Sequence, residues 1–89
     1  MLVGEFTVNN KVGLHARPAA NFVQTASKFK SKITVIKDGR EVNAKSIVSV
    51  LSLGAERGSK IVVKVEGVDE QEAMEAIKEL IENNFGELE

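Results

Sequence analysis

Apolar and polar residues follow strand-like and helix-like spacings along most of the chain. Apolar residues alternate with other residues over 2–8 and again over 61–65, which predicts two strands with one buried face each. Residues 33–36 are mostly β-branched and predict another strand. Apolar residues recur with helical spacing over residues 19–29 and 73–81, which predicts two amphipathic helices.

Turn and capping residues complete this pattern. Asp38-Gly39 is a strong hairpin signal and leads into a further strand over residues 40–43. Ser46 can cap a short helix that runs through Leu53 and is closed by Gly54. The β-branched residues of this segment favour a strand equally well, so its secondary-structure propensity is ambiguous. Asp69 and Glu72 form a variant of the capping box ahead of the last helix.

The predicted order of elements is β-α-β-β-α-β-α, which favours an α+β fold. Alternating strands imply a sheet with one solvated face, so we expect all three helices on the other face. The first helix is expected to cross between two parallel strands. We therefore predict an open-faced β-sandwich with a four-stranded antiparallel-type sheet, built as one domain over residues 1–89.

Composition narrows the class of protein. The 89 residues are 43% hydrophobic and 28% charged, as in a globular domain, and they include no cysteine, so a disulfide or thiolate metal site is excluded. Neither a signal-peptide pattern nor a membrane-spanning apolar segment is present. We therefore expect a cytoplasmic protein that does not insert into membranes.

Charge is unevenly distributed. Residues 1–40 carry a net charge of +5, whereas residues 66–89 carry one of −8. The positive part contains His15, and such a field favours an acidic partner or a phosphoryl group. A solvated acidic helix with scattered lysines would give the same distribution, so charge alone does not decide between the two interpretations.

Residues 13–20, Gly-Leu-His-Ala-Arg-Pro-Ala-Ala, hold the only histidine just before a predicted helix. A helix start offers unpaired backbone N–H groups and a partial positive charge, and Arg17 adds a cation that can bind phosphate oxygens. These positive surroundings disfavour the imidazolium, so we expect a neutral ring that can attack phosphorus. From spacing alone, a histidine that merely lies on the surface or caps the helix remains the commoner explanation.

Other chemistries find little support. One histidine without cysteine leaves too few ligands for a metal site, and no serine or cysteine is placed beside His15 for a hydrolytic triad. Neither a P-loop nor a G-x-G-x-x-G motif is present, so no nucleotide cofactor is expected. The near-neutral total charge and the absence of Trp and Tyr argue against direct nucleic-acid binding.

A second informative segment covers residues 43–54. Helical spacing places Ile47 and Leu51 on one face with Val48 beside them, while Val50 and Leu53 point elsewhere. One of these faces could belong to the core and the other to a surface that binds a partner. The pattern equally allows all of these residues to be core.

Four segments together resemble HPr, the histidine-containing phosphocarrier family of the bacterial phosphoenolpyruvate-dependent sugar phosphotransferase system. They are Gly13–Ala19, Gln24–Phe29, Asn43–Ile47 and Leu51–Gly54. The resemblance covers essentially the whole chain, and agreement at separated segments with the same spacing makes it specific. It favours a phosphoryl acceptor over a merely structural histidine.

The resemblance implies specific roles for residues of this chain. His15 matches the histidine whose Nδ1 accepts a phosphoryl group from Enzyme I and passes it to sugar-specific enzyme II components, chiefly IIA domains. Arg17 and the backbone of Ala16 and Arg17 would hold the phosphoryl group. Partner-binding positions match Ala20, Ile47, Val48 and Leu51. The resemblance implies a monomeric carrier for carbohydrate uptake, without a cofactor or a metal, and not an enzyme.

Ser46 matches a regulatory phosphorylation site of many family members. The resemblance implies a Ser46 kinase/phosphorylase and a catabolite-control transcriptional regulator as further partners. An alternative function is therefore a regulatory module that acts mainly as a Ser46-phosphorylated co-repressor. The family's regulatory paralogue lacks the histidine, so His15 argues against that paralogue. Val12 departs from the family pattern, which commonly has a polar residue there.

Overall fold

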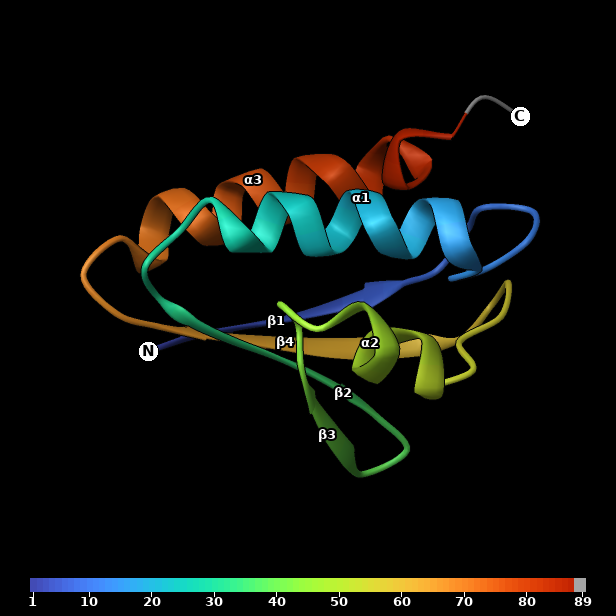
Figure 1. Ribbon diagram of the computed structural model, residues 1–89, viewed down its shortest axis with the longest axis horizontal. Helices are drawn as coiled ribbons and strands as arrows, with labels where there is room; N and C mark the ends of the chain where they lie inside the picture. Colours follow the sequence, from blue (N-terminus) through green and yellow to red (C-terminus); the bar gives the residue numbers. More distant parts are fainter. Residues whose placement is uncertain (88–89) are drawn as a thin grey trace.

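The computed structural model describes residues 1–87 and places four strands in one sheet, with the helices on one face (Figure 1). This architecture confirms the predicted α+β open-faced sandwich and its order of elements. In chain order the elements are β1 (Leu2–Thr7), α1 (Ala16–Ser27), β2 (Lys32–Lys37), β3 (Arg40–Asn43), α2 (Ile47–Ser52), β4 (Lys60–Glu66), α3 (Glu70–Glu82) and the short 3₁₀ helix η1 (Asn84–Gly86).

The strands lie in the order β1-β4-β2-β3, and every neighbouring pair is antiparallel. β1 and β2 are consequently parallel to each other, with β4 between them, and α1 makes the connection. Val35 in β2 lies opposite Val42 of β3 on one side and Val63 of β4 on the other. The predicted hairpin is confirmed, since Asp38 and Gly39 both have positive φ, as a tight type I′ turn requires.

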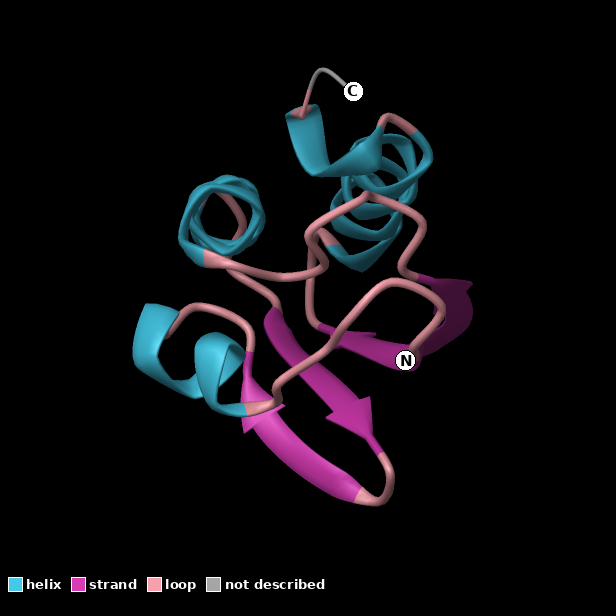
Figure 2. Cartoon of the chain, turned by 90° about the vertical axis from the view of Figure 1, so that its right-hand side faces the viewer, coloured by secondary structure: helices cyan, strands magenta, loops and turns pink. Residues whose placement is uncertain are grey.

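The core lies between the sheet and the two long helices. Phe22 of α1, Ile77 of α3 and Val63 of β4 are each fully buried there. Figure 2, viewed from the end of the molecule, shows α1 and α3 side by side above the sheet, with α2 beside α1. α2 also contacts β3, so both long helices and the shorter one shield the same side of the sheet.

The predicted capping box at the start of α3 is wrong. Asp69 occupies the N-cap position, but its side chain makes no capping hydrogen bond. Its carboxylate instead accepts hydrogen bonds from the amides of Lys30 and Ser31, at 2.8 and 2.9 Å, and from the Ser31 hydroxyl. Asp69 therefore ties the end of the α1–β2 loop to α3, a contact between residues far apart in the sequence.

Candidate functional site

His15 is the N-cap residue of α1, with extended backbone angles and an exposed side chain that does not cap the helix. The first backbone hydrogen bond within α1 runs from the Ala19 amide to the His15 carbonyl, at 2.9 Å. Pro18 has no N–H, so only the amides of Ala16 and Arg17 lack a partner within the helix. The imidazole therefore begins a helix whose two free amides can bind an anion.

The loop before His15 is fixed from two sides. The side-chain amide of the fully buried Asn10 donates to the Gly13 carbonyl, and the Gly13 amide donates back to the Asn10 carbonyl at 3.1 Å. The Leu14 amide donates to the Ala55 carbonyl at 2.9 Å. Gly13 has φ of +67°, and a Cβ there would lie 2.6 Å from the Ala55 carbonyl oxygen. This close approach needs glycine, and it holds the His15 backbone against the chain after α2.

Sequence reasoning assigned no role to Asn10. An asparagine just after a predicted strand is typical of a turn, and nothing local indicates complete burial. Its Oδ1 atom is buried without a hydrogen-bond partner among the described residues. Asn10 is therefore a structural support for the loop that presents His15.

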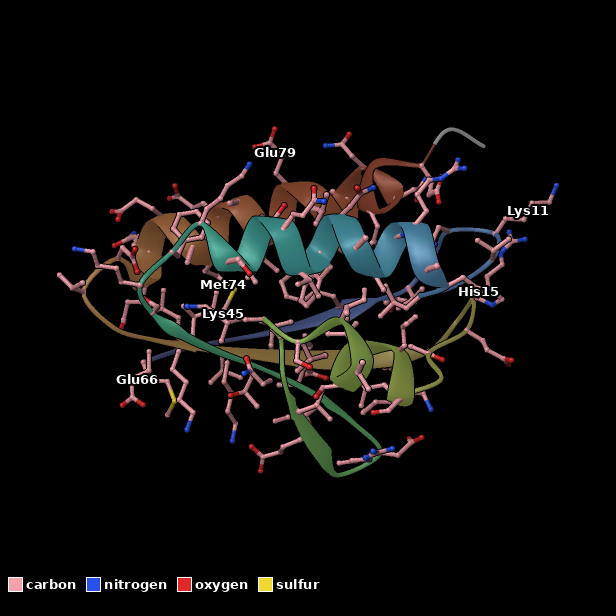
Figure 3. All side chains as sticks on the ribbon, viewed as in Figure 1. Lys11, His15, Lys45, Glu66, Met74 and Glu79 are labelled. Carbon is pink, nitrogen blue, oxygen red and sulfur yellow. The ribbon has the colours of Figure 1, made fainter. Side chains whose placement is uncertain are left out.

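His15 borders a shallow depression of about 270 Å³ between the start of α1 and the end of α2. Figure 3 shows His15 at the same end of the molecule as Lys11, opposite the end that carries Glu66. The depression is lined by Leu14, His15, Ala16, Leu51, Gly54, Ala55 and Glu56. The structure thus brings the predicted acceptor His15 and the predicted partner-binding residue Leu51 into one concave surface.

α2 presents its apolar residues on two sides, which is one of the two arrangements that the sequence left open. Ile47, Val48 and Leu51 are 37%, 74% and 40% exposed. Val50, by contrast, is fully buried. Because Val48 is mostly exposed, the interpretation in which every apolar residue of this segment is core is wrong. We call Ile47, Val48 and Leu51 the α2 surface. Ala20, the fourth predicted partner residue, lies on α1 and is half-buried.

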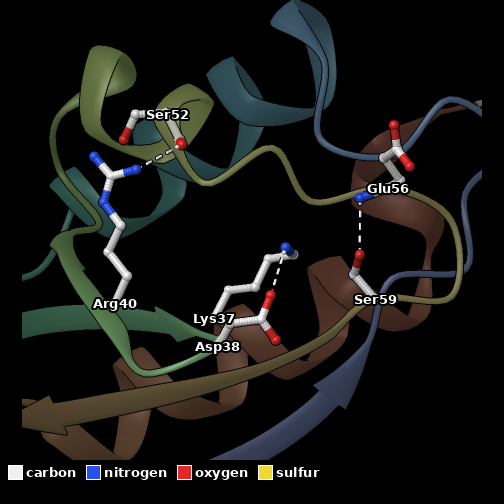
Figure 4. Close-up of polar contacts among 6 residues, drawn as sticks. All are labelled: Lys37, Asp38, Arg40, Ser52, Glu56 and Ser59. Atoms are coloured by element: carbon white, nitrogen blue, oxygen red, sulfur yellow. Dashed lines mark hydrogen bonds and ion pairs between the residues drawn. The ribbon is translucent and has the colours of Figure 1, made fainter.

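Both ends of α2 are held in place by polar contacts. Ser46 is the N-cap residue, as predicted, and its hydroxyl accepts a hydrogen bond from the Ser49 amide at 3.3 Å. At the other end, Arg40 of β3 donates to the Ser52 carbonyl at 2.9 Å (Figure 4). The Glu56 amide donates to the Ser59 hydroxyl at 2.9 Å and closes the following turn. Ser46 and Arg40 therefore hold the two ends of α2 in place.

Arg17 follows His15 by two residues, and its guanidinium is 82% exposed. One of its nitrogens, Nη1, lies 3.8 Å from the Glu87 carboxylate, whose side chain is only 15% exposed. The sequence predicted Arg17 as a cation for phosphate oxygens but gave no sign of this acidic neighbour. A contact with residue 87 depends on how the chain turns after α3, which no local pattern reveals.

A larger hollow than the one at His15 lies elsewhere on the described surface. It measures about 510 Å³ and is lined by residues of β2, β3 and the loops that flank them, among them Lys30, Lys32 and Lys45. Two hydroxyl-bearing residues line it, Ser31 and Thr34, and the Ser31 hydroxyl already donates to Asp69. The larger hollow contains neither the histidine nor an activated nucleophile. The smaller depression at His15 is therefore the better site for chemistry.

Neither a metal site nor a membrane span is formed by the part of the chain that the structure describes. Over residues 1–87, no three His, Asp or Glu side chains gather where they could hold a metal ion. No helix within that range is long and apolar enough to cross a bilayer.

Known proteins resemble this chain over nearly its full length. Residues 3–83 match the family described as "PTS HPr component phosphorylation site". The phosphocarrier protein HPr of Xylella fastidiosa (strain Temecula1 / ATCC 700964) is 55% identical over 87 residues, 98% of each chain. The HPr-like protein Crh of Halalkalibacterium halodurans is 52% identical over 82 residues, 92% of this chain and 98% of that protein. The crystal structure of HPr-C-His from Thermoanaerobacter tengcongensis superposes with a TM-score of 0.95 at 53% identity, covering 100% of both chains.

Proposed function

The chain belongs to the HPr family of phosphocarrier proteins of the sugar phosphotransferase system, and from this premise we propose that His15 carries the phosphoryl group. The observation that carries this assignment is the position of His15. It is an exposed imidazole at the N-terminus of α1, beside two amides without an intrahelical partner. It is also the only histidine of the chain.

The transfer step uses the Nδ1 lone pair of a neutral imidazole. Nδ1 forms a bond to phosphorus while the bond between phosphorus and the donor breaks, and the donor keeps that electron pair. The ring proton stays on Nε2. The phosphoryl oxygens accept hydrogen bonds from the amides of Ala16 and Arg17, and the Arg17 guanidinium supplies a cation with a planar fork of donors. The protein thus acts as a carrier of one phosphoryl group and not as an enzyme.

The donor and the acceptor in this proposal are Enzyme I and sugar-specific enzyme IIA domains. Both would dock on the α2 surface and Ala20, because Leu51 of the α2 surface lines the depression that His15 borders. Exposed apolar residues beside a reactive group favour a partner that covers them. We further propose that the carrier is a monomer in the cytoplasm, where these partners act.

A regulatory function through Ser46 is the second candidate. Ser46 is half-buried at the N-terminus of α2 and directly precedes Ile47 of the α2 surface. A phosphate added there by a Ser46 kinase/phosphorylase would change the charge of the docking surface. In that form the protein would bind a catabolite-control transcriptional regulator.

Incubation with Enzyme I and phosphoenolpyruvate, followed by intact mass measurement, tests the assignment of His15. We expect one phosphoryl group on the wild-type protein and none on His15→Ala. Acid treatment should remove it, because phosphohistidine is acid-labile whereas phosphoserine is not. A phosphoryl group on His15→Ala, or one that survives acid, would contradict the proposal.

Ser46→Ala is the matched control for this experiment. It removes the other proposed phosphorylation site and leaves His15 untouched, so it should still accept the acid-labile group. Because the His15 side chain is exposed and makes no capping bond, His15→Ala should unfold at nearly the same urea concentration as wild type. Loss of acceptance then reports on chemistry and not on folding.

A further inference from the structure

The larger hollow, of about 510 Å³, lies where β2 begins and β3 ends. Because the two strands run antiparallel, the loop before β2 and the loop after β3 meet there and complete its wall. No described residue lines both this hollow and the depression at His15. Figure 3 shows Lys45 toward the end of the molecule that carries Glu66, away from His15. The larger hollow can therefore hold a small organic molecule apart from the proposed site of phosphoryl transfer.

Three lysines contribute to the wall, and none of them pairs with an acid within residues 1–87. Lys30 and Lys32 are exposed around the start of β2. Lys45 is half-buried, and its Nζ atom donates to the Phe29 carbonyl at 2.7 Å. This bond fixes the Lys45 ammonium and uses one of its N–H donors, so the remaining donors can bind a ligand.

The acids at the larger hollow are already engaged by the protein. Glu41 is the one acid among the described lining residues, and its Oε1 atom lies 3.9 Å from Nζ of Lys64 in β4. Asp69 accepts hydrogen bonds from the Ser31 hydroxyl and from the amides of Lys30 and Ser31. Three lysines against one glutamate give the lining a net charge of +2. The hollow therefore favours an anion.

Two neutral groups add directional hydrogen bonding. Thr34 of β2 lies directly opposite Asn43 of β3, and both line the larger hollow. The Asn43 Oδ1 atom accepts the Lys45 amide at 2.9 Å, which leaves the side-chain NH₂ group of Asn43 as a donor. Neither this NH₂ group nor the Thr34 hydroxyl makes a hydrogen bond to another group within residues 1–87. The unused polar atoms of the wall are therefore chiefly donors.

We propose that the larger hollow binds a small phosphate ester, with its phosphate among the three lysines and its organic part beside Thr34 and Asn43. An ionised phosphate offers only acceptor oxygens, and its charge of about −1.5 to −2 matches the net charge of the lining. Hydroxyl groups of the organic part can bind the Thr34 hydroxyl and the Asn43 amide. No covalent bond is made or broken, so the hollow is a binding site and not a second site of phosphoryl transfer.

An NMR titration of the isotope-labelled, unphosphorylated protein with glycerol phosphate tests this site without Enzyme I. We expect saturable shifts of the backbone amides of residues 30–34 and 41–45, and smaller shifts for residues 15–17. Adenosine monophosphate should shift the same amides because it shares the phosphate, and the tighter of the two probes identifies the class of organic part. Glycerol, which lacks the phosphate, should shift none of them.

A short single-stranded oligonucleotide is the control for general binding of polyanions. It should bind more weakly than glycerol phosphate, because the described lining offers no aromatic ring on which a base could stack.

Variants of the lining give the second part of the test. Lys30→Gln combined with Lys32→Gln should weaken binding of glycerol phosphate about tenfold, as expected when hydrogen bonds from charged groups are lost. Both side chains are exposed, so this double variant should keep the fold. Lys60→Gln combined with Lys78→Gln removes the same charge at exposed positions outside the hollow, and should bind within about twofold of wild type. Thr34→Val, which removes one neutral hydrogen bond, should weaken binding about threefold.

Equal losses of affinity in the two double variants would overturn the proposal, because only net charge would then matter. Larger shifts at residues 15–17 than at residues 30–34, or loss of binding in Arg17→Gln, would place the anion at the start of α1 instead. Glycerol that binds as well as glycerol phosphate, or an oligonucleotide that binds more tightly, would also rule out a phosphate-ester site. None of these results would affect the assignment of His15, which the mass measurement tests separately.

Discussion

The rings of Phe22 and Phe85 meet edge to face, with centroids 6.1 Å apart and ring planes inclined by 64°. This contact joins α1 to the turn after α3, and both side chains are fully buried. Edge-to-face pairs stabilise proteins beyond the burial of their area. The C-terminal turn is therefore part of the core, although it lies beyond the last predicted helix.

Phe85→Ala should lower the free energy of unfolding by about 3–5 kcal/mol, because it removes the buried ring and leaves a cavity. Phe85→Leu keeps much of the apolar volume and should lower it less. Urea denaturation followed by far-ultraviolet circular dichroism measures both changes. Val68→Ala, at a side chain that is 87% exposed, should stay within about 0.5 kcal/mol of wild type. Equal midpoints for Phe85→Ala and Val68→Ala would contradict the packing role of Phe85.

Asp69 makes the stability of the fold depend on acid. The Ser31 hydroxyl and the Lys30 amide donate to its carboxylate and hold the pKa of Asp69 below its ordinary value. A lowered folded-state pKa stabilises the protein above the unfolded-state pKa of about 3.9, and this stabilisation is lost as pH falls through the folded-state value. The Gly67 amide and the N-terminal amine lower the pKa of Glu70 in the same direction.

We therefore expect Asp69→Asn to melt at a lower temperature than wild type at pH 7. The difference should shrink as pH falls from about 5 toward 2, because the wild-type carboxylate is then protonated too. Thermal unfolding across this pH range measures the effect. Glu75→Gln, at an exposed position of the same helix, serves as the matched control. A difference from wild type that stays constant at every pH would show that charge at Asp69 is not the cause.

Some features of this fold are determined by neighbouring residues, and others by contacts between residues far apart in the sequence. Alternation and helical spacing predicted β1, β4 and the two long helices, because a buried face repeats at the period of its own element. β-branched residues predicted β2, the hairpin signal predicted β3, and the capping serine predicted α2. Helical spacing separated two faces of α2 but did not show that one of them is exposed. The predicted capping role of Asp69 is wrong because its side chain binds the amides of Lys30 and Ser31, which lie 39 and 38 residues earlier in the sequence.

The candidate site divides in the same way. The position of His15 at a helix start and the cap at Ser46 depend on neighbouring residues, so the sequence revealed both. Burial of Asn10 and the approach of Glu87 to Arg17 depend on contacts between distant segments. No spacing rule encodes such contacts, and only the folded chain reveals them.

Arg17→Lys should slow phosphoryl transfer from Enzyme I by roughly tenfold, the effect of about 1.4 kcal/mol on the barrier. Lysine keeps the positive charge but loses the planar fork that binds two phosphate oxygens at once. Because Arg17 is 82% exposed, the free energy of unfolding should change by less than about 0.5 kcal/mol. Rapid-quench kinetics measures the rate, and an unchanged rate would show that charge alone is required.

Val48→Asp tests the α2 surface as the docking site for Enzyme I. Val48 is 74% exposed, and a partner that covers it would have to bury the new charge, so we expect about a tenfold higher KM. The fold should not suffer, since an acidic residue in the first turn of a helix is favourable. Val68→Asp places the same charge at another exposed valine, outside the α2 surface, and should leave KM unchanged. Similar KM values for both variants would rule out docking at Val48.

Ser46 offers the test that separates a capping role from a regulatory one. Its hydroxyl accepts the Ser49 amide, so Ser46→Ala should lower the free energy of unfolding by about 1 kcal/mol. Ser46→Asp keeps an oxygen acceptor at the same N-cap position and adds a negative charge. If Ser46 only caps α2, Ser46→Asp should unfold like wild type, and all three proteins should accept phosphoryl groups from Enzyme I at the same rate.

The proposed regulatory role predicts a different result. Ser46 borders Ile47 and Val48, so a charge there must be desolvated, or repelled, when a partner covers the α2 surface. A phosphoserine would add about 1.5 to 2 negative charges, and aspartate adds one, so Ser46→Asp gives a lower limit for the effect. We therefore expect Ser46→Asp to melt no lower than Ser46→Ala and yet to accept the phosphoryl group several-fold more slowly. Ser46→Asp would then be at least as stable as Ser46→Ala but slower in transfer, a combination that loss of the cap cannot produce. Equal transfer rates for the two variants would leave Ser46 as a helix cap and nothing more.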